Sequence, residues 1–528
     1  MTELPGTWQE VEIVEVLAPN ENGKPFQQGW SPQCERFPAP EGAWGVLKTT
    51  AIQHGEFWPH ENKALPDHLE PRPQIEVKVG DVVMTCAGPR SRCGVACLVE
   101  QTRSRLMLSG KMYRFRPHPD GLDPKYLAYL IQRHETQLEI DRMKTGINDS
   151  GLNLTHDRFS SLRVPLAPLR EQHRIVAKIE ELFSELDKAV ESLTLARTQL
   201  KTYRQSLLKA AFEGKLTADW RAANPDKLEP PETLLARIRA ERDARYEQAL
   251  THWKTALAEW RAAGEVGERP SKPKRPEKIV PESAEPGLWP DVPADWRRCF
   301  LGELDVHIFD GPFGSNLKSS DYVEAGVRVV RLENIGFGKF INEKKSFISK
   351  DKYETIKKHT VRPGDIVFSS FVTDAIRSTI IPEDVPAAVN KADCFAIRAF
   401  GTRFGERFLQ YFLECRNAFK QVEGMIHGVG RPRINTTQLK EISVPVCSPQ
   451  EQAEIIDRLE RDLSGIDKFD LEVRDQLTHI AVLRQSILKK AFSGQLIPQD
   501  PTNEPAAALL ARLRDQAPPA RTRRRKTA

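Results

Sequence analysis

The sequence predicts an α+β protein with a pseudo-two-fold internal repeat, in which two globular β-rich domains are joined by two long helices that pair as an antiparallel coiled coil. Three observations support this fold class. Residues 164–216 recur as residues 444–496 at a constant offset of 280, with 19 identities in 53 positions. Both copies carry a heptad spacing of apolar residues, which is typical of a helix that packs along another helix. Short apolar runs follow Gly-Asp turns upstream of both copies, as strands do.

The heptad spacing defines a seam on each helix. The first seam runs through Ile175, Ile179, Leu182, Leu186, Ala189, Leu193, Ala196, Leu200, Tyr203, Leu207 and Ala210. The second seam runs through Ile455, Leu459, Ile466, Phe469, Val473, Ile480, Leu483 and Ile487. Asp462 and Gln476 interrupt the second seam, where Leu463 and Leu477 offer apolar surface one residue later. Since neither seam has a partner in its own half, we expect the two helices to pair with each other.

The repeat and the composition shifts divide the chain into six predicted regions. They are a first β-rich domain at 1–165, a first long helix at 166–220, a charged helix with a Pro-rich linker at 221–291, a second β-rich domain at 292–445, a second long helix at 446–498 and a basic tail at 499–528. The β-rich domains are related more loosely than the helices, and Leu152-Asn153 is matched to Ile434-Asn435 at an offset of 282. Similar helices and divergent domains predict a common docking partner on the helices and a different task for each domain.

Composition narrows the class of protein. The 528 residues carry a net charge of +5, which permits a polyanionic partner without requiring one. No run of 18 apolar residues occurs, and the N-terminal sequence lacks the features of a signal peptide, so we expect a cytoplasmic protein. The eight cysteines form no CxxC pair, so the sequence predicts no zinc ribbon and no bound metal.

A search for catalytic motifs favours a recognition protein over an enzyme. The sequence contains no HExxH, no GxSxG and no full dinucleotide-binding fingerprint. Polar and basic residues gather instead in Gly-punctuated loops, where Arg can bridge guanine, Asn can bridge adenine and Lys can hold phosphate. The predicted DNA-binding residues are Arg90, Arg92, Lys111, Asn148 and Asn153 in the first domain and Lys318, Arg331, Asn334, Arg431, Arg433 and Asn435 in the second.

The whole plan resembles the specificity subunit of type I restriction-modification enzymes. The resemblance is carried by V-P-x-x-x-x-x-E-Q at residues 164–172 and 444–452, by R-Q-S-x-L-K-x-A-F-x-G at residues 204–214 and 484–494, and by G-P-F-G-S-N-L-K at residues 311–318. It implies two target recognition domains that each read one half of a split site in double-stranded DNA, and a chain that is itself not catalytic.

The resemblance also implies partners. Two methyltransferase subunits would dock on the helices, and restriction subunits would join the complex. S-adenosylmethionine, ATP and Mg would be bound by those subunits, with no cofactor in this chain. The predicted docking residues are Glu171, Gln172, Arg204, Gln205, Glu451, Gln452, Arg484 and Gln485.

Two other functions stay open at the level of sequence. A coiled-coil scaffold or adaptor with two protein-binding heads would share the repeat but would be indifferent to polyanions. A fused methyltransferase-endonuclease would modify DNA without partners, and it would need the catalytic motifs that the sequence lacks.

Overall fold

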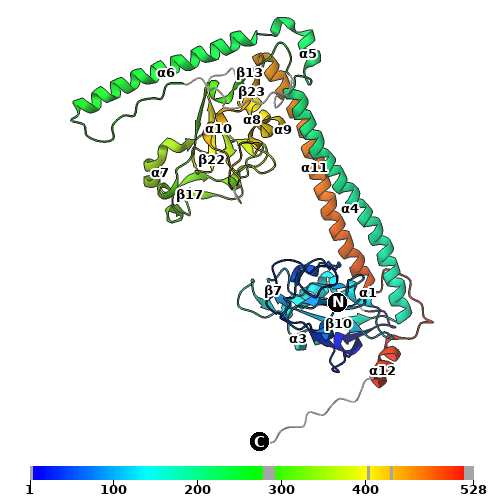
Figure 1. Ribbon diagram of the computed structural model, residues 1–528. Helices are drawn as coiled ribbons and strands as arrows, with labels where there is room; N and C mark the ends of the chain where they lie inside the picture. The colour runs from blue at the N-terminus through cyan, green and yellow to red at the C-terminus, as the bar shows by residue number, and fades with distance from the viewer. Residues whose placement is uncertain (1–3, 277–291, 401–404, 429–431, 517–528) are drawn as a thin grey trace. The chain divides into compact units, whose positions relative to one another are not determined.

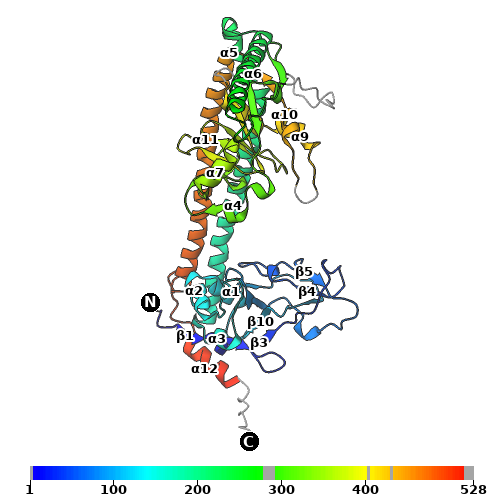
Figure 2. The ribbon, with the colours of Figure 1, turned by 90° about the vertical axis from the view of Figure 1, so that its left-hand side faces the viewer.

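The computed structural model describes residues 4–276, 292–400, 405–428 and 432–516 (Figures 1 and 2). These residues form two compact units. The first unit comprises the chain up to Thr194 together with the chain from Val473 onward, and the second comprises Leu195–Glu472. Each unit therefore holds one β-rich domain, half of the first long helix and half of the second.

The first β-rich domain has a main sheet in the order β2-β10-β6-β8, with β3 also paired to β10, and a second sheet in the order β5-β4-β9. Two short pairs, β1-β12 and β11-β7, complete it. Its elements are β1 (Gln9–Glu12), β2 (Leu17–Ala18), β3 (Phe26–Gln28), β4 (Gly45–Leu47), β5 (Asn62–Ala64), β6 (Val82–Thr85), β7 (Ala87–Gly88), β8 (Ala96–Leu98), β9 (Leu106–Met107), β10 (Met112–Pro117), α1 (Pro124–Gln132), α2 (His134–Met143), β11 (Leu152–Asn153), α3 (His156–Ser160) and β12 (Arg163–Leu166).

The second β-rich domain repeats this plan with sheets β14-β22-β19-β20 and β15-β17-β16-β21-β18 and the pair β13-β23. Its elements are β13 (Arg297–Phe300), β14 (Val306–Phe309), β15 (Tyr322–Val323), β16 (Val327–Val330), β17 (Ser346–Ile348), α7 (Lys350–Ile356), β18 (Thr360–Val361), β19 (Ile366–Ser369), β20 (Ser378–Ile380), β21 (Ala388–Asn390), β22 (Cys394–Ala399), α8 (Glu406–Glu414), α9 (Arg416–Glu423), α10 (Thr436–Lys440) and β23 (Ser443–Val446).

The two long helices are α4 (Leu169–Phe212) and α11 (Pro449–Ala491), and they run antiparallel. In the first unit Arg484 of α11 forms an ion pair with Asp187 of α4. In the second unit Arg204 of α4 pairs with Asp467 of α11 at 3.4 Å. These ion pairs are equivalent, because both partners of one lie 280 residues from those of the other. The α+β class, the antiparallel pairing and the pseudo-two-fold repeat are therefore confirmed.

The seam departs from strict heptads in three places. Tyr203 is 56% exposed and Phe469 is 60% exposed, and Leu483 also lies at the surface. The neighbouring residues Arg204, Asp470 and Arg484 face the partner helix instead, in ion pairs. In a straight α-helix, residues spaced seven apart rotate away from the partner by about 20° per heptad. Four heptads after Ile175, Tyr203 has therefore turned away from the partner helix and the following residue, Arg204, faces it. Leu463 is buried, as predicted.

Three further α-helices lie outside the β-rich domains: α5 (Ala218–Ala223) and α6 (Pro231–Ala262) in the second unit, and α12 (Ala506–Gln516) in the first. Each unit has its own hydrophobic core, in which the ends of α4 and α11 pack with the β-rich domain of that unit. Among the described residues, no helix is long and apolar enough to cross a membrane.

Candidate nucleic-acid interface and helix junctions

A hairpin between Thr145 and Asn153 lies beside β7 in the first unit. The backbones of these two residues exchange hydrogen bonds of 2.8 and 2.7 Å, which close the base of the loop. Asn148 is exposed within the loop and Asn153 is exposed at its base. The structure therefore brings these two predicted DNA-binding residues together at one edge of the domain.

Arg90 reaches the same hairpin through its guanidinium group. Its Nε donates to Asp149 Oδ1 at 3.1 Å and its Nη1 donates to Asp141 Oδ2 at 2.6 Å. A hydrogen bond from Lys144 Nζ, 2.8 Å long, holds the pKa of Asp141 below its ordinary value. Arg90 is thus exposed but already paired, and a phosphate or a base would have to replace these carboxylates.

Arg92 and Lys111 differ in whether their side chains are free to bind DNA. The Arg92 guanidinium donates to the carbonyl oxygens of Thr49 and Ile52, so it anchors a turn within the domain. Lys111 is exposed, and its carbonyl accepts a 2.8 Å hydrogen bond from the backbone of Cys86, next to β7. Lys111 belongs to the hairpin edge, whereas Arg92 contributes mainly to packing.

The second unit contains an equivalent hairpin closed by His427 and Arg433, whose backbones exchange hydrogen bonds of 3.0 and 2.9 Å. The Arg433 guanidinium lies 5.0 Å from the ring centroid of Phe371, and its Nη1 lies 3.8 Å from Asp393 Oδ1. Half of this side chain is exposed. The predicted residue Arg431 lies outside the described residues.

The backbone register corrects one match between the two halves. Leu154 donates to the Cys86 carbonyl and Ile434 donates to the Ser370 carbonyl, at 2.8 and 3.0 Å, so these two buried residues are equivalent at an offset of 280. Asn153 therefore corresponds to Arg433, and the match of Leu152-Asn153 to Ile434-Asn435 is wrong by two residues. The second hairpin is two residues shorter between its closing pair, which conceals the true register in the sequence.

Two predicted DNA-binding residues of the second unit have structural roles. Asn435 caps α10, because its side chain accepts a 2.9 Å hydrogen bond from the backbone of Gln438. Asn334 is 1% exposed, and its amide donates to the carbonyls of Ile341 and Lys344 at 2.8 and 2.9 Å while its Oδ1 accepts from Arg331. The enclosed amide of Asn334 is not available to a base edge in this conformation. Asn435 is exposed, and only its Oδ1 is used in the cap, so this residue stays a predicted contact.

Arg331 and Lys318 stay at the surface of the second unit. Arg331 Nη1 donates to Ser346 Oγ at 3.3 Å and lies 3.5 Å from Glu333 Oε1, while Lys318 is exposed in its loop. Arg331 also lines a pocket of about 250 Å³ that contains Lys391, whose ammonium group donates to the Tyr322 hydroxyl at 3.3 Å. Sequence reasoning missed Lys391 because no glycine-punctuated loop surrounds it.

The Gln residues of the two E-Q motifs are buried, and their side chains form hydrogen bonds with backbone groups of the same unit. Gln172 Oε1 accepts from the backbone of Asp123 at 2.8 Å, and its amide donates to the carbonyls of Gly121 and Ala167. Gln452 repeats this, since it accepts from the backbone of Gly405 at 3.3 Å and donates to the Cys447 carbonyl at 2.9 Å. Each Gln fixes the start of a long helix to the helix α1 or α8 of the same unit.

The Glu residues of the same motifs bind the segments around the start of each long helix. Glu451 Oε1 accepts from Thr217 Oγ1 at 2.8 Å and from Arg221 Nη2 at 2.7 Å, and its Oε2 accepts from Trp296 Nε1 at 2.9 Å. Glu171 Oε1 accepts from Gln499 Nε2 at 2.7 Å. Both carboxylates are buried, so both act within the junctions.

The Gln residues of the R-Q motifs bracket the helix pairs of the β-rich domains. Gln205 donates to the Glu414 carbonyl at 3.3 Å and accepts from the backbone of Arg416 at 3.0 Å, at the turn between α8 and α9. Gln485 donates to the Gln132 carbonyl at 3.3 Å and accepts from the backbone of His134 at 2.8 Å, at the turn between α1 and α2. The C-terminal end of each long helix therefore contacts the β-rich domain that precedes the other long helix in the chain.

The Arg residues of these motifs are also engaged within the chain. Arg204 Nη2 donates to Glu414 Oε2 at 3.0 Å in addition to its ion pair with Asp467, and Arg484 pairs with Asp187. All eight predicted docking residues thus have contacts inside their own unit. These side chains are engaged within the chain, and their part in docking partners stays a prediction.

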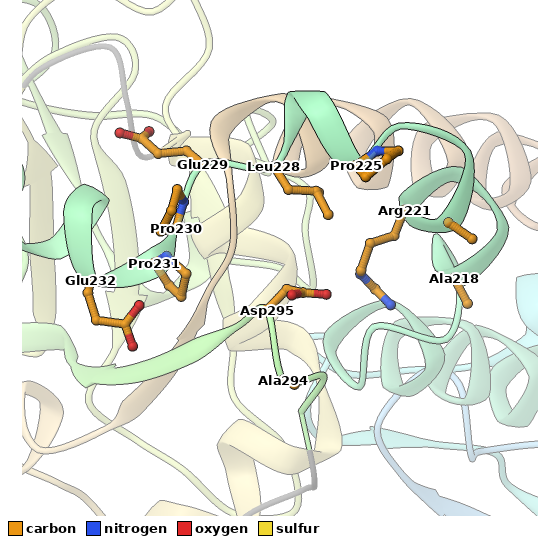
Figure 3. A pocket seen from close by; sticks show the side chains of 11 residues that line it. Ala218, Arg221, Pro225, Leu228, Glu229, Pro230, Pro231, Glu232, Ala294 and Asp295 are labelled. Carbon is orange, nitrogen blue, oxygen red and sulfur yellow. The ribbon is translucent and has the colours of Figure 1, made fainter.

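An open pocket of about 680 Å³ lies where α5, the start of α6 and the segment before β13 meet (Figure 3). Arg221 and Asp295 are among the side chains that line it. Arg221 is committed to Glu451, and Glu232 forms a 2.6 Å ion pair with Arg297. The paired charges favour a packing junction over a reactive site. Among the described residues, no cluster of His, Cys, Asp and Glu could hold a metal ion.

Comparison with known proteins identifies the family of the repeat. The family model "Type I restriction modification DNA specificity domain" matches residues 5–193 and 322–470. The specificity subunit of the type I restriction enzyme EcoEI from Escherichia coli is 40% identical over 200 residues, which are 38% of this chain and 33% of that protein. The chain thus matches about a third of the length of this relative.

Two further similarities extend over most of the chain. The specificity subunit of the type I restriction enzyme MjaVIII from Methanocaldococcus jannaschii is 22% identical over 398 residues, which are 74% of each chain. A solved structure from a study of complex assembly and conformational transition in a type I restriction-modification system covers 94% of this chain and 100% of its own, with a TM-score of 0.59 and 18% identity. At that identity the structural likeness shows a shared fold.

Proposed function

This chain belongs to the family of type I restriction-modification DNA specificity subunits, and we propose that each of its two β-rich domains reads one half of a split DNA site. Such a subunit selects the DNA sequence and is not itself catalytic. We propose residues 1–165 and 292–445 as the two recognition domains, residues 166–220 and 446–498 as the helical spacers, residues 221–291 as a linker and residues 499–528 as a tail.

One observation carries the half-site proposal. The two domains present hairpins in the same backbone register, but with different side chains: Thr145 and Asn153 close the first hairpin, and His427 and Arg433 close the second. A shared scaffold with different side chains at the same edge suits two readers of different sequences. The proposed contacts are made by Arg90, Lys111, Asn148 and Asn153 on one half-site and by Lys318, Arg331, Lys391 and Arg433 on the other, with Arg431 and Asn435 as further candidates.

We propose that two methyltransferase subunits dock on the exposed apolar side chains of the long helices. Tyr203 and Leu483 occupy equivalent positions 280 residues apart, and both are exposed. Equivalent surfaces suit two copies of one partner. S-adenosylmethionine, ATP and Mg would then be bound by the methyltransferase and restriction subunits.

The test is a comparison of binding to two duplexes at moderate salt, with the chain assembled with its methyltransferase subunits. Specific binding predicts a tighter complex with a duplex that contains the site than with a scrambled duplex of equal length, by a factor of roughly 10³ or more. Equal binding to both duplexes would contradict the proposal. Indifference to any polyanion, heparin included, would favour the adaptor with two protein-binding heads.

A further inference from the structure

Helix α6 begins with the same packing that α12 uses. Leu234 and Ile238 of α6 are buried in the core of the second unit, and Leu509 and Leu513 of α12 are buried in the core of the first. Both helices carry the sequence Leu-Leu-Ala-Arg at these positions. Farther along α6, Arg245 Nη2 pairs with Asp305 Oδ2 at 2.7 Å. These contacts account for the first half of α6 and leave its second half unexplained.

The second half of α6 binds the chain that follows it. Trp260 Nε1 donates to the Gly267 carbonyl at 3.2 Å, and Trp253 Nε1 donates to the Pro270 carbonyl at 3.0 Å. Leu257, which lies between the two tryptophans in the sequence, is buried. We name residues 264–276 the strap. The two indole hydrogen bonds hold the strap against the second half of α6.

The strap presents basic side chains to solvent. Arg269, Lys272, Lys274 and Arg275 are all exposed. None of the four forms an ion pair with any residue that the structure describes, and Lys272 Nζ lies 5.7 Å from the ring centroid of Trp253. Four cations within seven residues, outnumbering the two acids of the strap, Glu265 and Glu268, suit an anionic partner.

The direction of α6 favours DNA as that partner. Within the second unit, the far end of α6 extends past the β-sheets toward the side where α7 and β17 lie (Figures 1 and 2). Ser346 of β17 contacts Arg331, one of the residues proposed to bind DNA. We propose that the second half of α6 and the strap form an arm that binds the phosphate backbone of the duplex beyond the second half-site. This inference rests on the proposed function, which supplies the duplex.

The experiment compares a long duplex with one that is trimmed at the flank of the second half-site. The variant is the triple substitution Lys272→Glu, Lys274→Glu and Arg275→Glu, in the chain assembled with its methyltransferase subunits. For the unmodified chain we expect trimming to weaken binding by roughly tenfold and to lower the salt slope, since each phosphate contact contributes about 0.9 to it. For the variant we expect weak binding of the long duplex and no further loss on trimming. A matched control, Glu265→Gln with Glu268→Gln, changes charge of the opposite sign in the same strap and should retain the effect of trimming.

Any other outcome contradicts the proposal that the arm binds DNA. Equal affinities of variant and unmodified chain for the long duplex would show that the strap does not touch DNA. Impaired assembly with the methyltransferase subunits, with an unchanged effect of duplex length, would show that the strap binds protein. If the unmodified chain did not discriminate site from scrambled duplex, the proposed function would fail, and that result is distinguishable because it does not depend on duplex length.

Discussion

The indole Nε1 of Trp296 donates a 2.9 Å hydrogen bond to the buried Oε2 of Glu451, and so ties the start of the second recognition domain to the start of α11. The other carboxylate oxygen accepts from Thr217 and Arg221, in the segment that follows α4. One side chain therefore joins a recognition domain to both long helices. In the first unit Trp8 Nε1 and Glu171 Oε2 hold the equivalent positions, and neither has a hydrogen-bond partner among the described residues.

This asymmetry predicts unequal costs for the same substitution. Glu451→Gln removes the charge that neutralises the largely buried Arg221, so we expect a loss of about 3 kcal/mol in the free energy of unfolding. Glu171→Gln removes a charge whose described partner is the neutral Gln499, so we expect a loss of about 1 kcal/mol. Chemical denaturation of both variants measures the difference. Equal losses would show that the two junctions are energetically alike.

The hydrogen bonds of Gln205 and Gln485 predict that the C-terminal end of each long helix stabilises the recognition domain that precedes the other long helix. Gln205→Ala leaves the backbone of Arg416 without its acceptor, so we expect faster hydrogen exchange in α8 and α9 and unchanged exchange in α1 and α2. Gln485→Ala should produce the reverse pattern, because Gln485 accepts from His134. Hydrogen exchange measured by mass spectrometry checks both variants, each serving as the control of the other. Uniform loosening of both domains in either variant would contradict the bracket assignment.

The burial of Glu414 predicts that the free energy of unfolding of the second unit depends on pH. Burial raises its pKa above the ordinary value of 4.5, and this effect exceeds the opposing effect of Arg204. As pH rises above 4.5, the unfolded chain releases this proton before the folded chain does, so the stability contributed by Glu414 falls until its raised pKa is passed. Glu414→Gln, which restores the residue present as Gln132 in the first unit, should gain stability relative to the unmodified chain as pH rises. Thermal unfolding between pH 4.5 and 8 measures this, and a difference that does not change with pH would refute it.

The exposed apolar residues on the helices predict the stoichiometry of partner binding. Tyr203→Glu places a charge on one proposed docking surface, so we expect complexes with one methyltransferase subunit in place of two. Leu483→Glu should do the same at the other surface, and the double variant should bind neither subunit. Lys201→Glu, at an exposed polar position of the same helix, is the control and should leave two subunits bound. Native mass spectrometry counts the subunits, and two subunits on the double variant would rule out these docking surfaces.

The helix pairing could be predicted from the sequence because burial repeats along the chain. Ile175, Ile179, Ile455 and Leu459 occupy the predicted seam and are fully buried. The prediction was wrong at Tyr203 because a regular heptad ignores the drift of a straight helix, and Arg204 could be placed only once its acidic partner Asp467 was known.

The site was less predictable, since polar residues have several uses that look alike in sequence. Asn435 and Asn334 lie in loops that resemble binding loops, yet one caps a helix and the other is enclosed by backbone carbonyls. The E-Q and R-Q motifs recur because each junction needs the same internal bracket. Recurrence alone could not distinguish that requirement from docking of a shared partner, and the hydrogen-bond partners of these side chains within the same unit support the structural role.

Mapping of methylated bases in host DNA tests the central claim most directly. The account predicts that a strain with this chain and its methyltransferase subunits methylates a split sequence, and that this methylation is absent without the chain. It further predicts that Arg433→Glu changes the bases required in one half of that sequence and leaves the other half unchanged. Simultaneous loss of the requirement in both halves, or methylation that does not depend on the chain, would contradict the account.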